Sequence, residues 1–347
     1  GLPLSEVTYP TLMKQAGYTT GAVGKWHLGA HPQFHPMKRG FDEYYGALGG
    51  GHVYFPEDKG SGEYKIPLER NGAAEAHTQY LTKHFGDEAA AYVARHASEA
   101  KPWMLYLAFN APHTPLVAPK EWIEKLSHIQ DQNRRVYAAM VCAMDEAIGD
   151  VLNKLDETKQ TENTLVFFIS DNGGPHLKSR GLTDFADNSP LRGAKGDVLE
   201  GGIRVPFLVS WPARIRPGLS EQPVTALDFL PTSLAAAGAT DLIPQNLDGV
   251  NLLPFLAGEK SGLPHEMIFW RSAGPGGNYA VRRGDMKLVR LGKSAPQLYD
   301  LANDIAAQNP AVVGELEAAI AEWEKGTIPP LFESPQSGKA AAKKKGK

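Results

Sequence analysis

Lys25 and His27 lie two residues apart in a segment, Tyr18 to Gly29, whose composition predicts an extended chain. Side chains at positions i and i+2 of an extended segment point to the same side. A fixed cation beside an imidazole is suited to binding an anion and moving a proton. The alternative is a surface turn that Trp26 anchors in the core, with no chemical task for its neighbours.

Asp171 and Asn172 directly follow an unbroken apolar run, Leu165 to Ile169. Such a run predicts a strand buried on both faces, as in a parallel sheet. Ligands of open α/β sheets bind beyond the carboxyl ends of the strands. A carboxylate beside a carboxamide suits a hard cation such as Ca²⁺ or Mg²⁺. A strand followed by an ordinary Asx turn explains the same residues without a metal.

Three further residues are candidates because of the loops that carry them. His113 follows the apolar run Trp103 to Phe109 and stands between two prolines, which stiffen its loop. Lys195 belongs to a glycine-rich loop, 188–206, which we expect to be exposed and tightly turning. His52 follows three glycines in a segment rich in polar groups available to a substrate, and we name it as a substrate-binding candidate.

Alternating apolar strands and amphipathic helices position these residues and predict an α/β fold with a mostly parallel sheet flanked by helices. The segment 39–46 looks like a loop. After residue 264 short strands follow one another, which predicts a small C-terminal antiparallel α+β subdomain with a hairpin at Gly284-Asp285. We therefore expect a catalytic α/β domain over 1–263, the subdomain over 264–332 and a disordered basic tail over 333–347. The expected strands are Tyr18–Gly24, Trp103–Phe109, Leu165–Ile169, Phe207–Trp211, Met267–Arg271, Tyr279–Arg283, Lys287–Leu291 and Gln297–Leu301; the expected helices are Ser5–Gly17 with Ser5 as cap, 73–100, Arg134–Leu155, Thr225–Ala237 and Glu315–Lys325.

Composition excludes several classes of function. The formal charge is −3, and because five lysines lie in the carboxyl-terminal tail the rest of the chain carries −8; this acidic body makes a nucleic-acid surface unexpected. No apolar run is long enough to span a membrane as a helix. Cys142 is the only cysteine, which excludes an intrachain disulfide and a cysteine zinc site. It lies away from the apolar stripe of a predicted helix, and we interpret it as a small packed side chain rather than a nucleophile.

Seven segments together resemble the sulfatase family, the formylglycine-dependent members of the alkaline phosphatase superfamily. They occur in the family's order, cover nearly the whole chain, and look most like bacterial sulfatases related to arylsulfatase A and N-acetylgalactosamine-6-sulfatase. The segments are GYTTGAVGKWHLG (17–29), RGFDEYYG (39–46), APHTP (111–115), SDNGG (170–174), PLRGAKGDVLEGGIRVP (190–206), DFLPT (228–232) and LYDL (298–301).

The resemblance implies an alkaline phosphatase-like fold and a role for each candidate. Asp171 and Asn172 would be Ca²⁺ ligands. Lys25 would bridge the nucleophile and the sulfate, while His27 would contact the nucleophile and act as the base that expels sulfate. His113 and Lys195 would hold the sulfate ester oxygens and assist the leaving group. In the family, a hydrated formylglycine attacks sulfur, and cationic groups stabilise the charge that S–O cleavage builds.

One part of the family pattern is missing from these 347 residues. The family's nucleophile is the Cys or Ser of a C-x-P-S-R type motif upstream of the GKWHLG segment, and an Asp-Asp pair lies further upstream. Cys142 is followed by Ala143, Met144 and Asp145 and does not match. We therefore expect this chain alone to be inactive towards sulfate esters and to bind Ca²⁺ weakly, the activity belonging to the full-length parent.

Two other functions fit parts of the pattern. Phosphodiesterases and phosphonate hydrolases of the superfamily share the sheet but usually place more His and Asp at the metal. A non-catalytic glycan-binding relative would keep the fold, although binding alone does not require Lys25, His27, His113 and Lys195 together. By resemblance to the family, we expect a sulfated glycan as substrate and a periplasmic or secreted protein.

Overall fold

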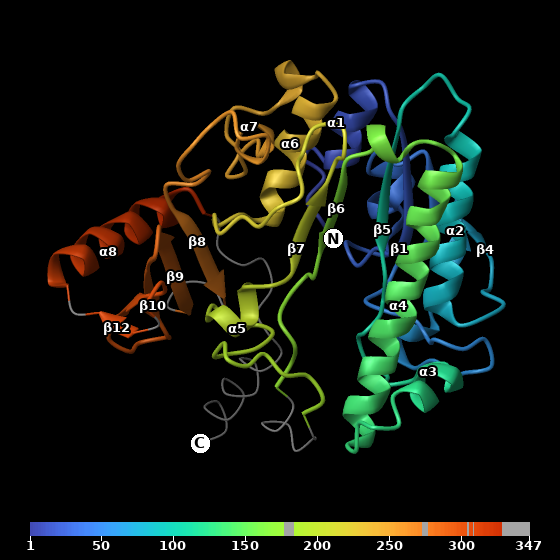
Figure 1. Cartoon of the computed structure of the whole chain (residues 1–347), viewed down its shortest axis with the longest axis horizontal. Coiled ribbons are helices and arrows are strands. Elements are labelled where there is room, and N and C mark those ends of the chain that lie inside the picture. Colours follow the sequence, from blue (N-terminus) through green and yellow to red (C-terminus); the bar gives the residue numbers. More distant parts are fainter. Residues whose placement is uncertain (177–183, 273–276, 304, 308, 328–347) are drawn as a thin grey trace, which may run out of the picture.

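The computed structural model describes residues 1–176, 184–272, 277–303, 305–307 and 309–327. A five-stranded sheet has the strand order β4-β3-β2-β1-β5, and it lies on the right of Figure 1. Strand β1 (Thr19–Lys25) lies between β2 (Glu43–Ala47) and β5 (Trp103–Ala108) and is parallel to both. Two short strands, β3 (Glu69–Arg70) and β4 (Ala73–Ala74), extend the sheet in antiparallel fashion. The α/β class predicted from the sequence is confirmed.

Strand β2 corrects the expectation of a loop over 39–46. Tyr44 and Tyr45 are each 2% exposed, one on either face of the sheet, and the register pairs Gly21 with Glu43 and Lys25 with Ala47. Close approach of the backbones requires glycine at two positions. A Cβ at Gly24 would lie 2.0 Å from the Ala108 carbonyl oxygen, and one at Gly46 would lie 1.9 Å from that of Gly24.

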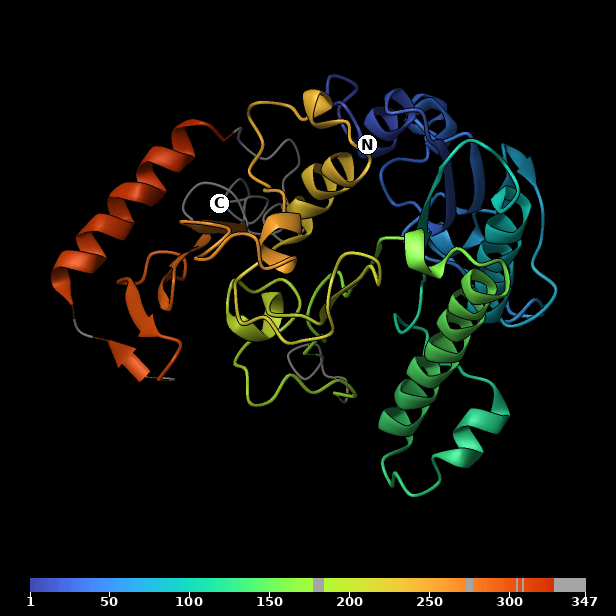
Figure 2. The same cartoon turned by 45° about the horizontal axis from the view of Figure 1, so that its top comes forward.

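Helices cover both faces of this sheet. On one face, α2 (Leu81–His96) and α4 (Gln132–Glu157) pack their apolar residues against Val23 and Tyr45, and the two helices run side by side in Figures 1 and 2. On the other face, α1 (Tyr9–Gln15) and α6 (Phe229–Ala236) pack against Ala22 and Tyr44. Neighbouring residues of one strand thus belong to different cores, as the pleat requires.

The strand that precedes Asp171 differs from the prediction. Strand β6 (Val166–Ile169) pairs with β7 (Phe207–Ser210) in antiparallel register, and among the described strands these two form a separate sheet. The side chains of β6 are half-buried, and Leu208 on β7 is 59% exposed. The expectation of a parallel strand buried on both faces is wrong here, because an apolar run does not distinguish a fully buried strand from a strand of a small sheet.

The C-terminal strands form the predicted antiparallel sheet, in the order β12-β11-β10-β9-β8. Strands β9 (Asn278–Arg283) and β10 (Met286–Arg290) make the expected hairpin, with Met286 opposite Arg283. The sheet is completed by β8 (Ile268–Ser272), β11 (Gln297–Asp300) and β12 (Ile305–Ala307). Helix α8 (Pro310–Lys325) packs on it through Leu316 and Ile320. This sheet and helix lie apart from the five-stranded sheet in Figure 1.

The amino-terminal ends of several helices differ from the predictions: α6 begins at Phe229 rather than Thr225, and α8 begins at Pro310 rather than Glu315. The N-cap position of α1 is Thr8, without a capping side-chain hydrogen bond, rather than Ser5, and α2 begins at Leu81, since residues 73–74 belong to β4. The expected tail, 333–347, lies outside the described residues. None of the described helices has the length and apolarity needed to cross a bilayer. The remaining short helices are α3 (Lys120–Lys125), α5 (Glu200–Ile203) and α7 (Leu253–Leu256), with single 3-10 turns at Pro32–Phe34, Pro36–Lys38, Gly62–Lys65 (η3), Thr161–Asn163, Ala226–Asp228 and Thr240–Leu242.

Candidate active site

Lys25 and His27 lie at the carboxyl end of the central strand β1. Between them, Trp26 is 7% exposed, and its indole N–H donates a hydrogen bond to the Phe34 carbonyl oxygen at 2.9 Å. The backbone N–H of Trp26 donates to the Ala47 carbonyl oxygen at 2.9 Å. His27 has a φ of 56°, in the left-handed region that L-residues other than glycine seldom occupy. Its side chain is 58% exposed. The strand end and the Trp26 anchor therefore fix where both polar side chains begin.

The charges around Lys25 come from three other segments of the chain. Burial lowers the pKa of Lys25, the Asp171 carboxylate raises it, the Lys195 ammonium lowers it and the Glu63 carboxylate raises it, in decreasing order of effect. Asp171 also contributes, after burial, to the raised pKa of Tyr106 on β5. Such effects require proximity. Residues 25, 63, 171 and 195, far apart in sequence, thus share one electrostatic environment.

His113 follows β5 and is held by its own loop and by two tyrosines. Its Nδ1 lies 2.9 Å from the Thr114 carbonyl oxygen and 3.2 Å from the Tyr64 hydroxyl. Because a carbonyl oxygen only accepts, Nδ1 carries the hydrogen and Nε2 is left for another partner. The Tyr54 hydroxyl donates to the His113 carbonyl oxygen at 2.8 Å. A fixed tautomer is suited to a proton donor or acceptor.

The loop after β6 is joined to the glycine-rich loop that carries Lys195. Gly173 N–H donates to the Gly202 carbonyl oxygen at 3.0 Å, and Lys195 N–H donates to the Gly174 carbonyl oxygen at 3.1 Å. A Cβ at Gly173 would lie 1.8 Å from the Gly201 carbonyl oxygen. Gly201 and Gly202 are buried in α5, so the expectation of an exposed loop holds for Lys195 but is wrong for these two glycines.

A buried lysine of the C-terminal sheet is hydrogen-bonded to the glycine-rich loop that carries Lys195. Lys287 on β10 is 1% exposed, and its Nζ donates to Glu200 Oε1 at 2.6 Å and to the Val198 carbonyl oxygen at 2.9 Å. Burial lowers the pKa of Lys287, and Glu200 opposes that shift. The loop carrying Lys195 is therefore tied to the antiparallel sheet by a desolvated ion pair.

Asp171 and Asn172 have the chemistry of calcium ligands but do not form a full set. Among the described residues, the Asp171 carboxylate has no hydrogen bond or ion pair, and Asn172 Nδ2 donates to the Gly173 carbonyl oxygen at 3.0 Å, leaving Oδ1 unpaired. Within the described ranges, no group of three His, Cys, Asp or Glu side chains could hold a metal ion. Ca²⁺ takes six to eight oxygen ligands. The two oxygens fit such an ion as part of its ligand set.

The contacts described for His52 are with Val53 and His77 rather than with the other candidates. Its Nδ1 lies 3.1 Å from the Val53 carbonyl oxygen, and its ring centroid lies 5.4 Å from that of His77, whose ring in turn lies 6.5 Å from that of His84. Burial lowers the pKa of His52. His52 as a substrate-binding residue stays a prediction.

Sequence reasoning missed Glu63 and Tyr64, which lie in the 3-10 turn η3. Glu63 Oε2 lies 3.9 Å from His27 Nε2, and the Tyr64 hydroxyl donates to the Thr114 carbonyl oxygen at 3.0 Å. The only signal in the sequence is that this polar turn shares a glycine-rich segment with His52.

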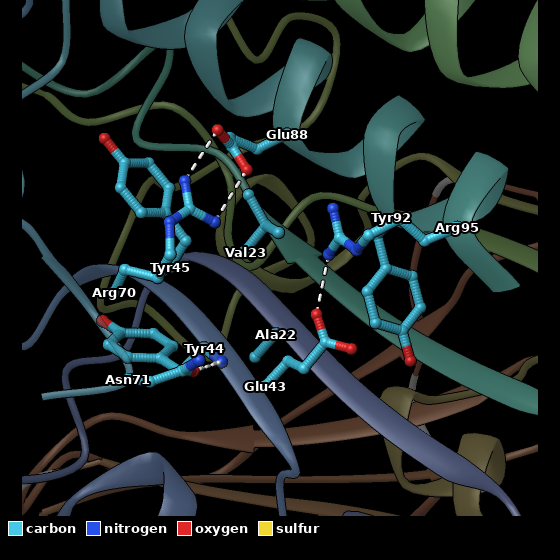
Figure 3. Close-up of a pocket in the computed structure, with 10 residues that line it drawn as sticks. All are labelled: Ala22, Val23, Glu43, Tyr44, Tyr45, Arg70, Asn71, Glu88, Tyr92 and Arg95. Atoms are coloured by element: carbon cyan, nitrogen blue, oxygen red, sulfur yellow. Dashed lines mark hydrogen bonds and ion pairs between the residues drawn. The ribbon is translucent and has the colours of Figure 1, made fainter.

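A pocket between α2 and strands β2 and β3 has no part in this cluster. Figure 3 shows its charged side chains directed towards one another. Arg70 pairs with Glu88 at 2.8 Å, and Arg95 pairs with Glu43 at 2.7 Å. Both of the described arginines that line this pocket are paired with carboxylates, so neither is available to an anionic substrate.

Comparison with known proteins gives the family. The sulfatase family profile matches residues 1–239, and that of the N-sulphoglucosamine sulphohydrolase C-terminal region matches residues 195–322. An uncharacterized sulfatase of Escherichia coli, YdeN, is 29% identical over 96% of this chain and 69% of its own length. Human N-acetylgalactosamine-6-sulfatase is 35% identical over 74% of this chain.

This chain spans 49% of the length of that human relative. Among solved structures, Ps i-CgsB in complex with k-i-k-neocarrahexaose superposes with a TM-score of 0.87 at 38% identity, covering 97% of this chain and 78% of that one. The profile covers well over half of the chain, and the fold agrees with it. The chain belongs to the sulfatase family.

Proposed function

We propose that the protein containing this chain hydrolyses sulfate esters of a glycan. The observation that carries the proposal is the environment of Lys25, in which a second cation, Lys195, and a carboxylate, Asp171, act on one half-buried ammonium group. Two lysine ammonium groups in one electrostatic environment can both contact the oxygens of a single anion, such as a sulfate ester. The name of the human relative and the oligosaccharide bound to Ps i-CgsB support a carbohydrate substrate.

Each candidate residue has a role in this proposal. Lys25 and Lys195 bind the sulfate oxygens and stabilise the charge that develops as the S–O bond breaks. One such donor contributes about 3 kcal/mol to lowering a barrier of this kind. His113, protonated on both ring nitrogens and held through Nδ1–H, would give the Nε2 proton to the leaving oxygen. His27 would act as the base in the step that expels sulfate, and Asp171 and Asn172 would be ligands of Ca²⁺.

Two further groups take part in the mechanism that the family resemblance implies. When bound, Ca²⁺ would add positive charge beside the sulfate, and the formylglycine of the complete protein would supply the attacking oxygen. The residues described here do the binding, charge stabilisation and proton transfer. We therefore propose that the 347-residue chain by itself does not turn over sulfate esters. By resemblance to the family, we also propose that the complete protein is periplasmic or secreted.

The test uses the complete gene product, a sulfated carrageenan oligosaccharide and 4-nitrophenyl sulfate, with release of inorganic sulfate as the readout. Lys195→Met is expected to lower kcat/KM by at least about 100-fold, the loss associated with one charge-stabilising donor. Lys120→Met is the matched control, since this lysine is 86% exposed on α3. Chelation of Ca²⁺ is expected to reduce the activity, and re-addition to restore it.

Three results would count against the proposal. Faster hydrolysis of 4-nitrophenyl phosphate than of the sulfate would favour a phosphodiesterase or phosphonate hydrolase. Oligosaccharide binding without sulfate release would favour a binding relative. Sulfate release by the 347-residue chain alone would refute its proposed dependence on the rest of the protein.

A further inference from the structure

Glu63 places a carboxylate at a site otherwise suited to an anion. Its Oε2 accepts a hydrogen bond from Gly50 N–H at 2.7 Å and lies 3.9 Å from His27 Nε2. Its charge raises the pKa of Lys25, so it acts on the same ammonium group as Asp171 and Lys195. The side chain is 48% exposed, which leaves part of the carboxylate open to solvent or to a ligand.

The turn that carries Glu63 is held in place on two sides. On one side, Glu63 is bound to the backbone of Gly50. On the other, the Tyr64 hydroxyl donates to the Thr114 carbonyl oxygen at 3.0 Å and lies 3.2 Å from His113 Nδ1. Two glycines make room for it: a Cβ at Gly50 would lie 2.7 Å from Glu63 Oε1, and one at Gly51 would lie 2.8 Å from the Tyr64 hydroxyl. Turn η3 therefore contacts both His27 and His113.

A fixed carboxylate here selects among substrates by charge. An ionised carboxylate only accepts hydrogen bonds, so it favours sugar hydroxyls as neighbours. It repels a second sulfate, and a partly desolvated site screens that repulsion less than bulk water does. Asp171 cannot do the same if it holds a cation, because its charge is then compensated.

We propose that Glu63 is a specificity-determining residue: it accepts hydrogen bonds from hydroxyls next to the reacting sulfate and disfavours glycans that carry a second sulfate there. This inference rests on the proposed sulfatase function. It assigns the substrate class as a glycan whose reacting sugar carries one sulfate and a free neighbouring hydroxyl.

The test compares two substrates of the complete protein. One is a carrageenan oligosaccharide whose reacting sugar carries a single sulfate, and the other is the same oligosaccharide with a second sulfate on the neighbouring hydroxyl. The wild type is expected to prefer the first. Glu63→Gln is expected to raise the kcat/KM ratio of disulfated to monosulfated substrate about 10-fold, mainly through KM, because the amide removes the charge and keeps the shape.

Two controls make the outcome specific. Glu57→Gln, in the same segment and exposed, is expected to leave the ratio unchanged. Raising the salt concentration is expected to reduce the discrimination of the wild type but not that of the Glu63→Gln variant. An unchanged ratio in an active Glu63→Gln variant would overturn this inference alone. A wild type that hydrolyses neither substrate would overturn the proposed function and this inference with it.

Discussion

The two halves of the candidate site are positioned by different means. Lys25, His27 and His113 form a sheet half, since they follow the parallel strands β1 and β5, whose hydrogen bonds set their spacing. Asp171, Asn172 and Lys195 form a loop half, in which contacts between glycines and hydrogen bonds between loops replace strand pairing. The sheet half has its own packed core, whereas the loop half depends on a lysine from the C-terminal sheet. Changes at a distance should therefore affect the two halves unequally.

The largest effect is expected from Lys287→Met, which leaves the Glu200 carboxylate, 15% exposed, without its partner. Removing one member of a buried ion pair costs about 3–5 kcal/mol. We expect a loss of stability of that size in denaturant unfolding. Relative to the wild type, hydrogen exchange should increase more over residues 192–202 than over β1.

The double variant Lys287→Met/Glu200→Gln is the control, because it removes the unpaired charge. It should recover part of the lost stability. Equal loosening of β1 and the 192–202 loop in the single variant would contradict the division into two halves.

A smaller effect is expected from Gly173→Ala. The added Cβ would meet the Gly201 carbonyl oxygen at 1.8 Å, and backbone atoms cannot move aside as a flexible side chain can. Overpacking of this kind costs about 1–3 kcal/mol. Thermal unfolding should show the loss, and sulfate release should fall because Lys195 is displaced from Asp171.

Gly149→Ala on α4 is its matched control. No heavy atom lies within 4 Å of the Cβ that it would add, and alanine is favoured over glycine inside a helix. This variant should be as stable as the wild type or more so. A destabilised Gly149→Ala protein would show that glycine substitution in general, rather than the loop contact, is the cause.

The smallest expected effect is a loss of stability at low pH, which should begin on the side of the molecule that carries the sheet half. Burial, followed by the charges of His52 and His84, lowers the pKa of His77 to about 4 from 6.5. Below pH 6.5 the unfolded chain takes up a proton that the folded chain refuses, so stability falls as the pH falls towards 4. At pH 5 this amounts to about 2 kcal/mol.

His77→Gln is expected to flatten the dependence of the melting temperature on pH between 6.5 and 4, while His128→Gln, at an exposed position, should not. Hydrogen exchange at pH 5 should increase around α2 and β2 before it increases in the loop half. The opposite order would place the acid-sensitive element elsewhere.

The sequence predicted best those features that local pattern determines. The segments at β1, β5, β6 and β7 are short and rich in strand-forming residues, and their positions agree with the structure to within one or two residues. The same pattern could not give pairing partners, and the direction of β6 against β7 was wrong. Strand β2 was missed because Glu43, the two tyrosines and Gly46 look like a polar loop, whereas Tyr44 and Tyr45 each fill a different core.

The candidate site was predictable only in part. Motifs for Lys25, His113, Asp171 and Lys195 are recognisable in the sequence, and the structure puts three of these four in one electrostatic environment. Glu63 has no such motif: its place beside His27 depends on how a glycine-rich segment folds back over the end of β1. Lys287 was assigned to a strand, but nothing in the sequence shows that its ammonium group reaches a loop 87 residues away.

The backbone of His27 has a consequence for evolution and engineering. Its φ of 56° is one that glycine adopts freely and histidine adopts at a cost of about 1–2 kcal/mol. A search for sturdier variants would therefore tend to accept glycine at this position and discard the imidazole. The variant of highest stability is therefore expected to lack the imidazole on which the proposed activity depends.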